Sequence, residues 1–85
     1  MSTMNTFFAI LAEYETAQIP VERCAALFGL EPKEACRRAS LQRLPVPAFR
    51  AGTQKSPWLV DAKHLAQHLD DAKARAKIEW EKMRA

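Results

Sequence analysis

Glycine, cysteine and long hydrophobic runs are all scarce in this sequence. It has two glycines among 85 residues and is 48% hydrophobic, a composition that excludes a disordered or low-complexity chain. The longest apolar stretch covers residues 7–12 and ends at Glu13, far short of the roughly 20 residues that a membrane-spanning helix needs. We therefore exclude a transmembrane protein and expect one small folded domain over residues 1–85.

The cysteines and the N-terminus indicate a reducing compartment. Cys24 and Cys36 lie apart in the chain without a CxxC motif, inside stretches with helical patterns, so two reduced core thiols are favoured over a disulfide or a metal site. The first six residues contain no Lys or Arg, and the apolar stretch behind them has no small-residue cleavage pattern. No secretory signal is expected, and the predicted location is the cytoplasm, in association with the nucleoid.

Motifs for catalysis, metals and nucleotides are missing as well. His64 and His68 share a helix face, but Leu65 stands where an HExxH zinc motif has its glutamate, and no further ligand is evident. Asp70 and Asp71 are neighbours on an expected helix, where their side chains point apart. Without a Ser/His/Asp or Cys/His arrangement or a glycine-rich phosphate loop, we predict no catalytic residues, no metal and no cofactor, and hence not an enzyme.

Positive charge is concentrated in the middle of the chain. Residues 1–32 carry one basic residue against four acidic ones, residues 33–55 carry six basic residues against Glu34 alone, and residues 56–85 are nearly balanced. A basic block of this kind is typical of a surface that meets an anionic polymer such as a nucleic acid. An ordinary solvated surface is the alternative.

Two amphipathic patterns predict a helix at each end of the chain. The first is expected over residues 5–16, with Asn5 or Thr6 as its N-cap. The second is expected over residues 62–85, with Asp61 as its N-cap and no Gly or Pro to interrupt it.

A helix-turn-helix is predicted between these ends. A short helix is expected over residues 20–28, with Pro20 in the first turn because its missing N–H has no partner there. Gly29 is expected to end this helix in the left-handed conformation. A third helix is expected from Glu31-Pro32 to about Ser40. Two short helices joined by a glycine-centred turn are the arrangement that a helix-turn-helix requires.

The third helix has a small inner face and a basic outer face. On a helical wheel, Ala35, Cys36 and Ala39 cluster on one side, opposite the long charged residues. Small inner residues permit close approach to the second helix, and long basic ones can reach phosphates and base edges. A solvated surface helix is the alternative. We expect this region to address the major groove through Lys33, Arg37, Arg38 and Gln42.

A β-hairpin wing is predicted over residues 46–60. Two short β-type runs flank a polar, basic loop, and Pro47 and Pro57 argue against a central strand on either side. We expect Trp58 to pack in the core rather than to stack on a base. The wing is expected to grip DNA backbone or minor groove through Arg50, Gln54 and Lys55, and the full set of expected DNA-binding residues is Lys33, Arg37, Arg38, Gln42, Arg43, Arg50, Thr53, Gln54, Lys55 and Ser56.

The last helix carries an apolar seam longer than a small domain can cover. An exposed seam would leave an apolar patch that soluble monomers usually avoid, so a homodimer is expected. Two-fold pairing would place two DNA half-sites about one turn, roughly 34 Å, apart. The alternative is a monomer in which Trp80 folds back on the wing or on the first helix. The expected dimer interface consists of Leu69, Ala72, Ala76, Trp80 and Met83.

The order of these parts resembles the pyocin activator protein family. The resemblance extends from Met4 to about residue 74, and it is carried by the order and spacing of local strings, namely Met4-Asn5-Thr6, Ile19-Pro20-Val21, Pro45-Val46-Pro47, Gln54-Lys55-Ser56 and the segment from Val60 to Ala66. It marks residues 1–3 as an extension, either a cloning remnant or an alternative start.

The resemblance implies a bacterial or prophage transcription activator that binds repeated promoter boxes upstream of genes for phage-tail-like bacteriocins. The expected fold class is mainly α with a β-hairpin wing, a winged helix-turn-helix with a long C-terminal helix. Double-stranded DNA is the expected partner, with RNA polymerase as a further candidate. Two alternatives stay open, an excisionase-like architectural DNA-binding protein and a phage-type adaptor that binds another protein through the C-terminal helix.

Overall fold

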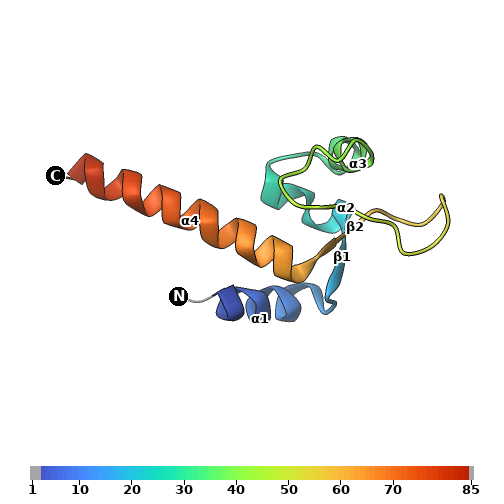
Figure 1. The fold of residues 1–85 in the computed structure, drawn as a ribbon, viewed down its shortest axis with the longest axis horizontal. Helices are drawn as coiled ribbons and strands as arrows, with labels where there is room; N and C mark the ends of the chain where they lie inside the picture. The colour runs from blue at the N-terminus through green and yellow to red at the C-terminus, as the bar shows by residue number, and fades with distance from the viewer. Residues whose placement is uncertain (1–2, 85) are drawn as a thin grey trace.

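The computed structural model describes residues 3–84 and is mainly helical. Helix α1 (Thr3–Tyr14) packs along the first half of the long helix α4 (Ala62–Arg84). Helices α2 (Val21–Cys24) and α3 (Pro32–Ser40) lie on the other side of α4, and the outer half of α4 projects beyond them and beyond α1 (Figure 1). The molecule is therefore elongated, with extents of 52 × 24 × 16 Å. Within the described residues, no helix is long and apolar enough to cross a membrane.

A short antiparallel sheet holds the two halves of the chain together. Strand β1 (Gln18–Pro20) pairs with β2 (Leu59–Asp61), and Ile19 faces Val60 at its centre. Both of these side chains are completely buried. The sequence prediction did not include β1, because three residues are too few to display the alternating pattern of a strand.

Of the β-hairpin predicted over residues 46–60, the described residues show one backbone bridge. Phe49 and Leu59 form an isolated antiparallel bridge, and each N–H donates to the other carbonyl, at 3.0 and 2.8 Å. The expected strand at residues 46–50 is otherwise absent from the described structure, because Pro47, next in register after Phe49, has no N–H to donate. Residues 50–58 therefore form a loop whose two ends are joined by the Phe49–Leu59 bridge, rather than part of a hairpin with two full strands.

The first helix of the predicted helix-turn-helix is shorter in the structure than expected. The expected helix over residues 20–28 is divided into α2 (Val21–Cys24) and a 3-10 turn, η1 (Ala25–Phe28). Pro20 is not in a helical turn but in β1, with extended backbone angles of φ −57° and ψ 131°. Gly29 is left-handed at φ 72°, as predicted, and its N–H donates to the carbonyl of Ala26 at 3.0 Å.

Helices α3 (Pro32–Ser40) and α4 begin where the sequence predicts. Glu31 precedes α3 in an extended conformation, and Pro32 occupies the first turn. The backbone N–H of Lys63 donates to the side chain of Asp61 at 2.8 Å, which confirms Asp61 as the cap of α4.

The start of α1 differs from the prediction. Asn5 and Thr6 lie inside the helix rather than at its N-cap, since α1 already begins at Thr3 and ends two residues earlier than expected. The hydroxyl of Thr6 instead donates to Asp70 Oδ1 at 2.6 Å and ties α1 to α4. Residues 1 and 2 of the expected extension lie outside the described residues.

The core gathers where α1, α2, α3, the sheet and the start of α4 meet. Its largest completely buried side chains are Ile19, Leu65, Val21, Val60 and Cys24. Cys24 and the half-buried Cys36 are both free thiols, as predicted. Burial raises the pKa of Cys24 to about 11, so this thiol stays protonated at neutral pH.

Gly29→Ala should lower the free energy of unfolding by about 1–2 kcal/mol, because a Cβ disfavours the left-handed conformation. The added carbon would meet no atom within 4 Å, so the cost is confined to the backbone. Urea denaturation measures it. Gly29→Asn is the matched control and should lose less, since asparagine tolerates this conformation. Equal stability of the alanine variant and the wild type would contradict the left-handed turn.

Candidate nucleic-acid interface

The outer face of α3 is basic and exposed. Ala35 and Ala39 are completely buried, and they let the helix pack closely against α2. Lys33, Arg37 and Arg38 point away from this contact and are exposed to solvent. The predicted division of α3 into a small buried face and a basic outer face is therefore confirmed.

Glu34 pairs with both arginines of this face. The Arg37 guanidinium donates to the two carboxylate oxygens, with Nη2 at 2.6 Å from Oε1 and Nε at 2.9 Å from Oε2. Arg38 Nε lies 3.2 Å from Oε1. These hydrogen bonds lower the pKa of Glu34 to about 2. An anionic ligand that approaches α3 must therefore compete with this carboxylate.

Gln42 has a structural role directly after α3. It adopts a left-handed backbone conformation, with φ 54°. Its side-chain amide donates to the carbonyl of Ala48 at 2.9 Å, and the N–H of Ala48 donates back to the amide oxygen at 3.3 Å. The amide that the sequence analysis assigned to the major groove is thus engaged in fixing the path of the chain from α3 to the loop. Arg43 beside it is exposed.

Residues 50–56 form an exposed polar loop. The turn is closed by the N–H of Ser56, which donates to the carbonyl of Thr53 at 2.9 Å. Thr53, Gln54 and Lys55 are exposed, whereas Ser56 is half-buried. Figure 1 shows this loop at the same end of the molecule as α3, opposite the C-terminal end of α4.

Trp58 anchors the returning limb of the loop. Its ring is half-buried and packs against the core, as predicted. The guanidinium of Arg50 lies over this ring, 4.4 Å from its centre. A stacked arginine of this kind retains its charge while losing part of its mobility. Arg50 is therefore presented in a defined position at the base of the loop.

The fold brings together most of the predicted DNA-facing residues at one end of the molecule. Between residues 32 and 60, Glu34 is the one acidic residue of the sequence. Its spacing to Arg37 and Arg38, three and four positions, could have predicted the ion pairs. The Gln42 contact and the Arg50–Trp58 stack had no such sequence pattern, because both depend on how the loop folds.

The described residues contain no cluster of metal-ligating side chains. Within residues 3–84, no three His, Cys, Asp or Glu side chains lie close enough together to hold a metal ion. The ring of His68 packs against Phe28, with ring centres 5.7 Å apart, while His64 is exposed. His68 thus serves packing between α4 and η1.

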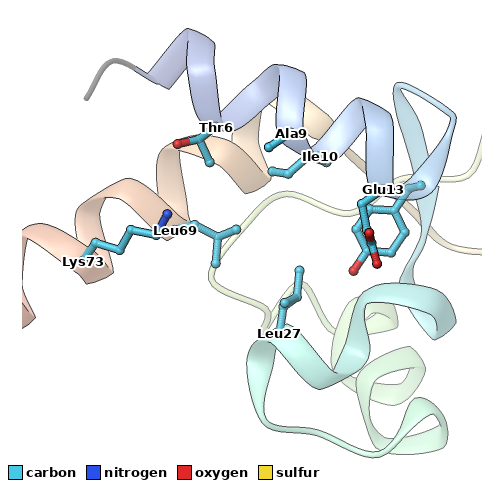
Figure 2. Close-up of a pocket in the computed structure, with 8 residues that line it drawn as sticks. Thr6, Ala9, Ile10, Glu13, Leu27, Leu69 and Lys73 are labelled. Carbon is cyan, nitrogen blue, oxygen red and sulfur yellow. The ribbon is translucent and has the colours of Figure 1, made fainter.

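A mainly apolar cleft of about 390 Å³ opens between α1, η1 and α4. Figure 2 shows Leu69 and Lys73 of α4 at one side and Leu27 of η1 at another, below α1. The cleft lies away from the basic end. The remaining residues that line it are Thr6, Ala9, Ile10, Glu13 and Tyr14.

The predicted dimer residues run outward from this cleft along α4. Leu69 and Ala72 are half-buried, whereas Ala76, Trp80 and Met83 are exposed. Trp80 does not fold back on the loop or on α1. It lies on the projecting half of α4, and the guanidinium of Arg84 is 4.6 Å from its ring centre.

Residues 6–76 match the family described as pyocin activator protein PrtN. The chain belongs to the pyocin activator family. No curated protein and no solved structure matches it. Membership indicates a transcription-activator role, in a family that is regulatory rather than enzymatic. The matched region of this pyocin activator family member includes α3 and the loop and ends before Trp80 and Met83.

The carboxyl carbon of Glu34 should titrate near pH 2 in NMR spectra, because both arginines favour its charged form. The ion pairs should therefore persist well below the ordinary value of 4.5 and be lost as the pH falls through about 2. Arg37→Ala combined with Arg38→Ala is the control, in which the titration should return towards 4.5. A wild-type midpoint near 4.5 would show that the pairs do not form in solution.

Proposed function

We propose that this protein is a sequence-specific DNA-binding transcription activator that meets promoter DNA with α3 and the loop of residues 50–56. The observation that carries this proposal is the placement of five cations, Lys33, Arg37, Arg38, Arg50 and Lys55, on two elements at one end of the molecule. Membership in an activator family supports the regulatory role.

Helix α3 is proposed to lie in the major groove. It is the second helix of the helix-turn-helix, and its buried alanines leave the outer face clear of other elements. An arginine can donate two hydrogen bonds to the O6 and N7 atoms of guanine, so Arg37 and Arg38 are the proposed base readers. Glu34 forms ion pairs with both arginines in the free protein. DNA sites that offer these arginines stronger contacts than Glu34 does are therefore favoured over other DNA sites.

The loop is proposed to contact the phosphate backbone. Arg50 is held on Trp58 at the base of the loop, and Lys55 lies exposed near its tip. Charged side chains on a loop without regular strands suit phosphate contacts, which need less exact geometry than base contacts. Promoter boxes as the DNA sites and RNA polymerase as a second partner rest on family membership rather than on a particular residue.

Arg37→Ala combined with Arg38→Ala should weaken specific DNA binding by about 2–6 kcal/mol, as expected for two lost base or phosphate contacts. Both side chains are exposed, so the circular dichroism spectrum and melting curve should stay close to those of the wild type. Mobility-shift titrations against genomic fragments measure the binding.

The control for this double variant is Lys63→Ala combined with Lys77→Ala, which removes the same net charge from exposed positions on α4. It should retain most of the specific affinity. If the arginine variant folds and binds DNA as tightly as the wild type, α3 is not the reading helix. If it fails to fold, the two arginines are structural.

Lys55→Ala should weaken specific and non-specific DNA binding alike, because a phosphate contact carries no sequence information. The slope of log affinity against log salt concentration should flatten by roughly one unit. Titrations at several salt concentrations on both kinds of DNA measure this slope. A loss limited to one base pair of the site would identify Lys55 as a base reader instead.

A further inference from the structure

The outer half of α4 exposes large apolar side chains that no element of the described chain covers. Trp80 is 56% exposed and Met83 87% exposed. With Leu69, Ala72 and Ala76 they follow one face of the helix, because all five fall within about 40° of Ala76 at 100° per residue. This face begins in the cleft between α1 and η1, since Leu69 belongs to both.

We propose that two copies of the chain pair through this face in an antiparallel arrangement, with the two-fold axis beside Ala76 and the end of each α4 seated at the cleft of its partner. The positions 69, 72, 76, 80 and 83 are spaced symmetrically about 76. In an antiparallel pair Met83 therefore lies opposite Leu69, and Trp80 lies opposite Ala72. Trp80 thus meets a small residue of the partner helix, and Met83 meets Leu69 at the edge of the cleft.

The cleft is large enough for side chains at the end of α4. It is mainly apolar at about 390 Å³, a volume that accommodates side chains rather than a whole helix. Met83 reaches it in the antiparallel register because it lies opposite Leu69. Glu13 and Lys73 both line the cleft, and Lys82 and Arg84 flank Met83. Glu13 is the cleft residue that can pair with this basic helix end.

The two rims of the paired helices carry different charges. On one rim, a helical wheel places Glu79 of one copy close to Arg75 of the other. On the other rim, Lys73 and Lys77 of one copy approach those of its partner. The Glu79–Arg75 pairs and the apolar seam must offset that repulsion.

This pairing places the two basic ends far apart. The starts of the two α4 helices are separated by about 42 Å, because Ala62 lies 14 residues from the axis at 1.5 Å per residue. Helix α3 and the loop of residues 50–56 lie beyond these starts (Figure 1). The half-sites are then farther apart than the roughly 34 Å, one DNA turn, expected from the sequence.

Sedimentation equilibrium on the full chain tests the pairing without DNA, so its result is independent of the proposed function. The wild type should have twice the monomer mass at micromolar concentration. Trp80→Ala combined with Met83→Ser should weaken the dimer by at least about tenfold and leave the helical content unchanged, because both side chains are exposed. A monomeric wild type, or a double variant that dimerises as strongly, would overturn the proposal.

Disulfide trapping tests the direction of the helices, in a background with Cys36→Ser. Ala76→Cys should give a covalent dimer on mild oxidation, because the two positions meet at the axis. Met83→Cys should not, because its two copies lie about 21 Å apart in the antiparallel register. Ready cross-linking of Met83→Cys, or failure of Ala76→Cys, would overturn the antiparallel arrangement.

Discussion

The pairing of Ile19 with Val60 is the constraint on which the rest of the structure depends. It joins two distant parts of the chain, and two further backbone hydrogen bonds extend it. Val21 N–H donates to the carbonyl of Trp58 at 2.8 Å, and Ala62 N–H donates to that of Ala17 at 2.9 Å. These bonds bring the two ends of the segment between β1 and β2 together. Helices α1 and α4, which flank the paired strands in the chain, therefore lie side by side. Burial of both central side chains fixes the register, because a shift by one residue would expose them.

The basic end of the molecule is a consequence of this closure. Helix α3 is held by its alanines against α2, which follows β1 directly, and the loop is held by the Phe49–Leu59 bridge at the edge of β2. Gln42 connects the two by bonding both backbone groups of Ala48. Few long-range contacts are thus needed to present α3 and the loop together. The outer half of α4, which no such contact restrains, is the part best suited to meet a second chain.

The sequence predicted the helices with strong end signals and missed the elements defined by long-range contacts. Pro32, Gly29 and Asp61 act within one turn of their own helix, so their roles could be predicted and are confirmed. Strand β1 could not, because its three residues form a strand only through pairing with β2. Pro20 suits a helix start and a strand end equally well in sequence, and the pairing with Leu59 decides between them.

The basic face of α3 was predictable, since charge and helical spacing are both local properties. The ion pairs of this face with Glu34 were also predictable, because Glu34 lies three and four positions before the two arginines. The contact of Gln42 with Ala48 was not predictable, because it depends on the left-handed backbone of Gln42, which nothing in the neighbouring sequence requires.

The central proposal, that α3 and the loop form the DNA-binding surface, is tested most directly by NMR mapping of amide shifts. The probe is a mixed-sequence DNA duplex about two helical turns long, added to the full chain at low salt. The largest changes should fall at residues 33–43 and 50–56, and residues 77–84 should change little. Changes concentrated on the outer half of α4, with α3 unaffected, would contradict it.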